Sequence, residues 1–155
     1  ARAMAKYVCN SYKTPPNLYP QDVKLRSLCD MALDFHQGTY YPKVTAVVLY
    51  PIVGWAPPVD DAKLKEAEET FKADIWPAMQ KIMKMAGGSV LGGAKVNIAD
   101  FFFATHIQAT VSKVPNSFVA KHDGLKKYLA AVKAQCPNWD KYMGGAVADF
   151  YAPAK

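Results

Sequence analysis

Apolar residues recur along most of this chain at the three- and four-residue spacing of an amphipathic helix. No segment of any length alternates strictly between apolar and polar residues, as a half-buried strand would. The spacing predicts a first helix over residues 1–12, with Met4, Val8 and Tyr12 on one face. An extended linker over residues 13–20 follows, since prolines interrupt it at Pro15, Pro16 and Pro20.

Two long helices are predicted next, each opened by an aspartate that can cap free backbone amides. Asp22 caps the first, which runs to about Leu49, and either Asp60 or Asp61 caps the second. The apolar stripe of the first is Leu25, Leu28, Cys29, Ala32, Leu33 and Phe35. That of the second is Leu64, Ala67, Phe71, Ile75, Met79 and Ile82 or Met83. Pro42 and Pro77 lie inside these helices and remove one backbone donor each, so we expect a kink at both.

The glycine-rich stretch "AGGSVLGG", residues 86–93, ends the second long helix. It lacks the Lys-Ser/Thr pair of a phosphate-binding loop and follows no strand, so we interpret it as a turn. Three shorter helices are predicted near 98–112, 124–135 and 139–147. The fold class is therefore all-α, with two long kinked helices and shorter ones packed on them.

The stretch "GGAKVNIADFFFATHI", residues 92–107, places one aspartate at the start of a strongly apolar helix. Asp100 follows Asn97 by three positions, which is the spacing of a capping box, in which each side chain binds the other residue's backbone amide. The carboxylate also lies at the positive end of the helix dipole. We favour this structural role for Asn97 and Asp100 over a catalytic carboxylate in an apolar pocket.

Composition and charge exclude several classes of protein. The net charge of +6 comes from lysines that are scattered singly or in pairs, so no stretch is typical of a nucleic-acid-binding arm. The longest apolar run, 44–59, is broken by prolines and a glycine and is too short to span a bilayer. Three distant cysteines without a CxxC pair argue against a disulfide framework and suit a reducing, cytoplasmic compartment. The three histidines show no metal-ligand spacing, so no metal is expected; they are His36, His106 and His122.

Several motifs resemble the C-terminal helical domain of cytosolic glutathione transferases. The segment "GGAKVNIAD" looks like that domain's capping motif, with Asn97 in place of the usual Ser or Thr. The segment "LYPQDVKLRSLCDMALDFHQGTYYPKV" resembles its first long helix in the insect delta and epsilon classes, and "CPNWDKYMGGAVADFY" resembles its ending. The opening "ARAMAKYVCNSY" looks like the last helix of a preceding thioredoxin-like domain.

The resemblance implies a division of the chain and a function. Residues 1–12 would end a thioredoxin-like domain, 13–20 would be a linker, and 21–155 would be the helical domain. In this family the thioredoxin-like domain binds the co-substrate glutathione, and the helical domain contributes to the electrophile pocket and the dimer interface. The alternative is a non-enzymatic dimerisation or docking module in a larger assembly. The expected partners are a second copy of the chain or a neighbouring thioredoxin-like domain, together with a small hydrophobic electrophile.

The electrophile pocket would be formed by the first long helix and the aromatic tail. The candidate residues are Asp34, Gly38, Tyr41 and Thr45, which share a helical face by their spacing, and Phe150 in the tail. A carboxylate is unusual in a pocket that relatives keep apolar, because burying it unpaired costs several kcal/mol. Asp34 therefore either faces water or binds a polar or cationic ligand. Tyr41 and Phe150 are also candidates for plain core positions.

Overall fold

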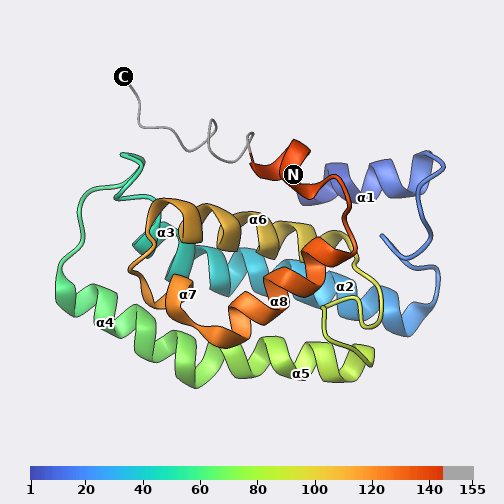
Figure 1. The fold of residues 1–155 in the computed structure, drawn as a ribbon. Helices are drawn as coiled ribbons and strands as arrows, with labels where there is room; N and C mark the ends of the chain where they lie inside the picture. The colour runs from blue at the N-terminus through green and yellow to red at the C-terminus, as the bar shows by residue number, and fades with distance from the viewer. Residues whose placement is uncertain (145–155) are drawn as a thin grey trace.

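The computed structural model describes residues 1–144, and every regular element in that part of the chain is helical. Figure 1 shows α1 (Arg2–Ser11) at the N-terminus and two long helices below it. The first long helix joins α2 (Val23–Phe35), η1 (His36–Thr45) and α3 (Ala46–Val48), and the second joins α4 (Asp61–Thr70), η2 (Phe71–Ile75) and α5 (Trp76–Ala86). The shorter helices are α6 (Ile98–Lys113), α7 (Phe118–Lys121), α8 (Asp123–Ala134) and η3 (Asp140–Gly144). The all-α class predicted from the sequence is confirmed.

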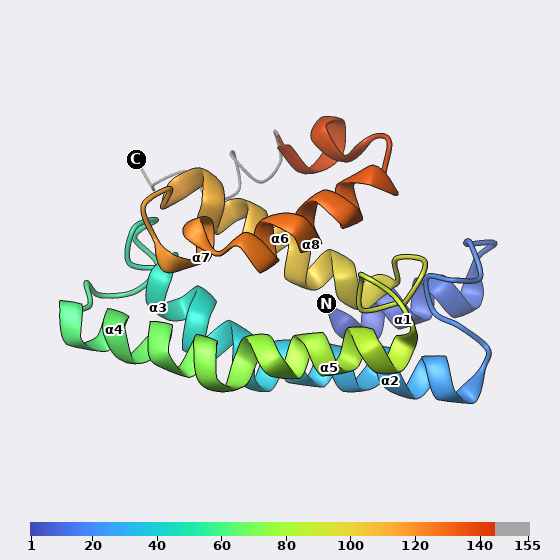
Figure 2. The same ribbon diagram turned by 60° about the horizontal axis from the view of Figure 1, so that its bottom comes forward.

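The two long helices lie side by side, and α6 and α8 form a second layer over them (Figure 2). Helix α6 packs against both α2 and η1, and α8 packs against α6. The core between the layers holds the largest buried side chains, among them Leu33, Tyr40, Phe71, Met79 and Phe103. Each of the predicted stripes contributes to this core, although Leu25, Phe35 and Leu64 remain partly exposed.

The helix boundaries follow from side-chain caps and glycines. The Asp22 carboxylate accepts a hydrogen bond from the amide of Leu25 at 2.9 Å, and Asp60, not Asp61, accepts one from Lys63 at 2.8 Å. Gly87 ends α5 in the left-handed conformation with φ of 82°, where a side chain would strain the backbone. The short helix α7 was not predicted, and its Ser117 cap accepts a hydrogen bond from the amide of Ala120.

The two internal prolines are accommodated by wide π-helical turns. Pro42 lies inside η1, and Pro77 follows η2 by two residues. In these stretches the backbone forms i→i+5 bonds, as between the amide of Ala46 and the carbonyl of Tyr41. The helices therefore run continuously over 23–48 and 61–86, because the wider turn absorbs the missing donor and the proline ring.

Asp100 has a larger structural role than the predicted cap. It forms the capping box with Asn97, and its fully buried carboxylate also accepts hydrogen bonds from two loop amides and one hydroxyl. These donors are the amides of Leu91 at 2.8 Å and Gly92 at 3.1 Å and the hydroxyl of Tyr128 at 2.8 Å. Burial raises the pKa of Asp100, and hydrogen bonds from Asn97, Leu91, Tyr128 and Gly92 lower it in part. One carboxylate thus joins the glycine-rich loop, the start of α6 and the middle of α8.

We expect Asp100→Ala to lower the free energy of unfolding by roughly 3–5 kcal/mol, because four donors, three of them in buried hydrogen bonds, lose their acceptor at once. Tyr128→Phe removes a single donor and should cost about 1 kcal/mol. The matched control is Asp61→Ala on the exposed start of α4, expected to change stability by about 0.5 kcal/mol or less. Urea unfolding of the variants measures these differences. A cost for Asp100→Ala no larger than that for Tyr128→Phe would contradict the role assigned to the carboxylate.

Candidate functional site

Asp34 faces water, which is one of the two outcomes considered for it. Its side chain is 76% exposed and forms an ion pair with Arg2 of α1. Arg2 also donates a hydrogen bond to the carbonyl of Leu33 at 3.4 Å. The cationic partner of this carboxylate is therefore supplied by the chain itself, and α1 is held against α2 through it.

The other candidate residues of the first long helix lie at different depths. Gly38 is exposed, and a side chain at that position would meet no atom within 4 Å. Tyr41 is half-buried, and Thr45 is buried. The π-helical turns of η1 explain the difference, because i→i+5 bonding rotates residues out of the row that α-helical spacing would place together. Phe150 lies outside the described residues.

Tyr41 belongs to a cluster of aromatic side chains at the end of the first long helix. The hydroxyl of Tyr50 donates a hydrogen bond to that of Tyr41 at 2.6 Å, and the two rings meet edge to face with centroids 5.6 Å apart. Trp55 lies against Tyr50 with ring centroids 5.2 Å apart, and His106 of α6 lies 5.5 Å from Tyr41. Since the Tyr41 hydroxyl accepts this bond, its own hydrogen is available to a polar group on a ligand. The cluster thus offers flat aromatic surface and two hydroxyls, of which that of Tyr41 can still donate a hydrogen bond.

A pair of histidines, His36 buried and His106 half-buried, lies behind Tyr41. The Nε2 atom of His36 and the Nδ1 atom of His106 are 2.8 Å apart, and the rings stack with centroids 4.9 Å apart. Phe102 and Phe103 meet the His36 ring edge to face. Burial lowers the pKa of His36 to about 3, with a smaller contribution from His106, and burial lowers the pKa of His106 to about 4. Both rings are therefore neutral at pH 7, and one ring nitrogen donates to the other.

The two histidines lie 70 residues apart in the sequence, so no local pattern predicted their contact. His36 does lie three residues after Leu33 and seven after Cys29, so the helical spacing already places it on the buried stripe. His106 comes from α6, and the structure shows its partner to be His36. Within residues 1–144, no three side chains among His, Cys, Asp and Glu are placed to hold a metal ion together.

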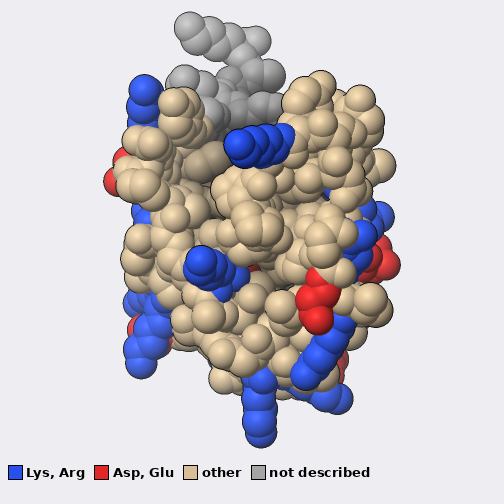
Figure 3. All heavy atoms as spheres, turned by 90° about the vertical axis from the view of Figure 1, so that its right-hand side faces the viewer, with Lys and Arg blue, Asp and Glu red and all other residues tan. Residues whose placement is uncertain are grey.

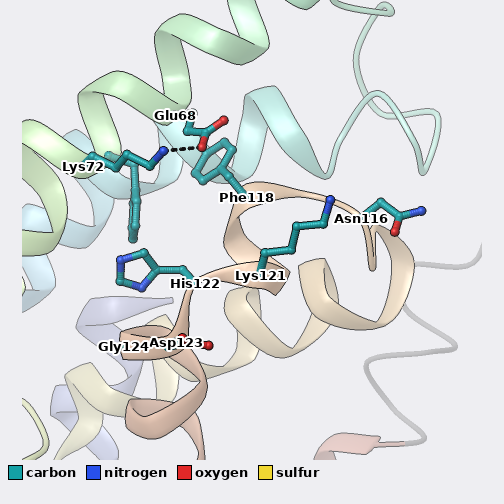
Figure 4. Close-up of a pocket in the computed structure, with 9 residues that line it drawn as sticks. Glu68, Lys72, Asn116, Phe118, Lys121, His122, Asp123 and Gly124 are labelled. Carbon is teal, nitrogen blue, oxygen red and sulfur yellow. Dashed lines mark hydrogen bonds and ion pairs between the residues drawn. The ribbon is translucent and has the colours of Figure 1, made fainter.

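Two hollows lie away from Tyr41. An apolar groove of about 620 Å³ separates α3 and the following loop from α7, with walls that include Val48, Ile52, Leu64 and Phe118. A more polar pocket of about 570 Å³ lies next to it and shares Glu68 and Phe118 (Figure 4). In that view the Lys72 ammonium points to Glu68, with which it forms an ion pair, while Lys121 extends toward Asn116. Among the described residues, none that the sequence predicted for ligand binding lines either hollow.

On the face seen in Figure 3 the charged side chains are dispersed. The view shows lysine and arginine side chains spread over the face, with uncharged residues and some acidic ones between them. Within the described residues, no helix combines the length and the apolar character needed to cross a membrane. These observations give no support to an extended nucleic-acid-binding surface on the face shown.

Known proteins of similar sequence are glutathione transferases. Human (Homo sapiens) glutathione S-transferase A1 is 33% identical over 100 residues, which are 64% of this chain and 40% of that protein. Glutathione S-transferase alpha I of Oryctolagus cuniculus is 30% identical over 125 residues, or 81% of this chain and 51% of that protein. The chain thus spans about half the length of the curated relatives it matches. No family model matches the chain.

Solved structures of insect glutathione transferases share the fold. A delta-class glutathione transferase of Nilaparvata lugens superposes with a TM-score of 0.75 at 21% identity, over 97% of this chain and 66% of that one. Isozyme E7 from Drosophila melanogaster gives a TM-score of 0.70 at 18% identity, over 97% of this chain and 64% of that one. The whole helical arrangement described above is therefore that of a large part of these proteins.

The histidine pair makes stability depend on pH. Folding lowers both pKa values below the ordinary 6.5. The contribution of these histidines to the free energy of unfolding is therefore fully present above pH 6.5 and is lost as the pH falls toward 4. For either ring taken singly the loss is roughly 3 kcal/mol over that range. The two losses do not add, because part of the His36 shift comes from His106. Replacing both, as His36→Gln with His106→Gln, should flatten the dependence, and His122→Gln, which removes a less buried histidine, should leave most of it. Urea unfolding between pH 7 and 5 tests this, and equal slopes for the double variant and the unaltered protein would refute it.

Proposed function

This chain is related to the glutathione transferases and has the fold of the helical part of their structures, and on that basis we propose that it is the helical domain of such an enzyme. Glutathione would be bound and activated by a thioredoxin-like domain outside residues 21–155. The helical domain would contribute one wall of the pocket for an electrophilic second substrate. The main support for this proposal is the superposition over 97% of the chain, together with the sequence identity to glutathione transferases.

The Tyr41 cluster is the best candidate for that wall. It combines exposed parts of aromatic rings with one hydroxyl that can donate a hydrogen bond, which suits an apolar molecule carrying a polar reacting group. Gly38, one turn earlier, leaves open space beside it. Asp34 lies farther toward α1 and is neutralised by Arg2, so the proposed electrophile needs no positive charge. Phe150 of the tail completes this proposal as a second aromatic contact.

Helix α1 supports the assignment of residues 1–12 to a preceding domain. The helix exposes three large apolar side chains and the residue after it exposes a fourth, and none of the residues of α1 is buried. These side chains are Met4, Tyr7, Val8 and Tyr12. A continuous apolar row of this kind on a short helix is typical of a surface that another domain or subunit covers. A thioredoxin-like domain of the same protein, or a second copy of the chain in a dimer, would cover it in the cytoplasm.

The proposal is tested by conjugation of glutathione to chlorodinitrobenzene, using the protein as isolated from its source with any neighbouring domain attached. Tyr41→Ala should lower kcat/KM for the electrophile by roughly tenfold or more, since it removes a buried part of the ring, and leave KM for glutathione unchanged. Tyr41→Phe removes the hydroxyl and keeps the ring, so it separates their contributions to kcat/KM. Tyr19→Phe is the matched control for Tyr41→Phe. It also removes a hydrogen-bonded tyrosine hydroxyl, which in Tyr19 donates to the carboxylate of Asp30.

Two results would count against the proposal in different ways. Conjugation that proceeds unchanged in Tyr41→Ala would remove the Tyr41 cluster from the electrophile pocket. A protein that carries a thioredoxin-like domain and binds glutathione but conjugates no electrophile would favour the non-enzymatic docking module instead.

A further inference from the structure

The apolar groove between α3 and α7 is separate from the proposed electrophile wall, since none of the described residues that line it belongs to the Tyr41 cluster. Its volume of about 620 Å³ is within the range of small-molecule sites, about 300–1,000 Å³. Pro51 and Pro58 line it, and their fixed φ angles stiffen the loop that forms one wall. Further apolar walls come from α3, α4, the end of α6 and α7, and include Val48, Leu64, Val114 and Phe118. A small molecule with an apolar body suits a hollow of this kind.

The charged residues that line the groove leave a negative balance. These residues are Asp61, Lys65 and Glu68. Lys65 pairs with Glu69 at 4.0 Å, and Glu68 pairs with Lys72, in each case four residues away along the same continuous helix. Among the described residues, no cation forms an ion pair with Asp61. With their partners included, three carboxylates thus face two ammonium groups.

Asp61 is left for a ligand because its neighbour caps the helix. The Asp60 carboxylate accepts the amide of Lys63 at 2.8 Å, so the cap of α4 does not depend on Asp61. Asp61 is the first residue of α4 and is exposed. Lys65 lies four residues later, where it can exchange between Asp61 and Glu69. Even with Lys65 shared in this way, one carboxylate of the set has no ammonium partner, which favours a cation.

Phe118 supplies an aromatic ring to the groove. Its centroid lies 5.6 Å from that of the buried Phe71, so the ring is supported from the core, and it stays partly exposed. Phe118 and Glu68 line this groove and also the adjacent pocket of Figure 4. An ammonium group is attracted to the face of an aromatic ring, whereas a carboxylate is repelled by it. The ring therefore favours the same sign of ligand charge as the carboxylates do.

We propose that this groove binds a compact organic cation, an ammonium group on an apolar body, with its nitrogen near Asp61 and its body against Ile52, Leu64 and Phe118. The charge is attracted by the surplus carboxylate, and the body is removed from water against the apolar walls. The inference rests on the groove alone and does not depend on the conjugating activity.

The test uses three probes that share one apolar body and differ in charge: adamantylamine, adamantanol and adamantanecarboxylate. Each is titrated into the protein, with any neighbouring domain attached, while nuclear magnetic resonance follows the methyl groups of Ile52 and Leu64. The amine should shift these signals at the lowest concentration and the carboxylate at the highest. The methyl groups of Ile107, which is buried in the core, serve as a reference and should not move. Raising the salt concentration should weaken the binding of the amine.

Single charge variants separate the groove from the overall charge of the protein. Asp61→Asn should weaken the binding of adamantylamine by about threefold, since the carboxylate nearest its nitrogen is lost. Lys65→Gln should strengthen it by a similar factor, because a competing ammonium group is removed. The matched control, Asp74→Asn, removes a carboxylate from an exposed residue of η2 outside the groove and should leave the affinity unchanged.

Three results would each overturn the proposal. They are equal affinities of the three probes, Ile52 and Leu64 signals that do not move, and an affinity for adamantylamine that is the same in Asp61→Asn as in Asp74→Asn.

Discussion

The buried carboxylate of Asp100 is the constraint on which the arrangement of the upper layer depends. A charged or polar group in the core is tolerated only where its hydrogen bonds are satisfied, and here four donors from three parts of the chain meet on it. The glycine-rich loop can reach it because Gly92 has no side chain; a carbon there would lie 2.2 Å from the carbonyl of Lys95. The same region is reinforced by Gln135, which accepts the amide of Val96 at 3.0 Å.

This joint also orients the N-terminal part of the chain. The linker after α1 is bound to the start of α6, because the amide of Ile98 donates to the carbonyl of Leu18 at 2.9 Å and Asn17 donates to that of Val96 at 2.7 Å. Ion pairs of Lys6 with Asp30 and of Arg2 with Asp34 then hold α1 along α2. Helix α1 is consequently fixed with its apolar row turned outward, which is the orientation that the proposed neighbouring domain requires.

The prolines have a comparable influence on the candidate site. Pro42 lies in the wide turns of η1, and the helix continues past it to Val48. In these turns the side chain of Thr45 is buried, while that of Tyr41 stays near the surface. The chain then returns through Tyr50, whose ring meets that of Tyr41 edge to face, and Trp55, whose ring lies against Tyr50. The neutral histidine pair fills the space behind, so the cluster rests on a packed and uncharged support.

Local patterns in the sequence were sufficient for most of the fold. Helical periodicity, the aspartates at 22 and 60, the capping box at Asn97 and Asp100 and the glycine at 87 act over three or four residues, and so their effects can be predicted without knowing what lies nearby. The motifs that resemble a glutathione transferase are also local, and the fold agrees with them. The sequence did not predict how deeply the four candidate pocket residues of the first long helix are buried. Their shared face was inferred from α-helical spacing, and the π-helical turns of η1 change that spacing. These residues are Asp34, Gly38, Tyr41 and Thr45. Only the tertiary structure brought His36 to His106, Tyr128 to Asp100 and Trp76 to Gly124, since these contacts join helices whose relative positions depend on packing across the whole core.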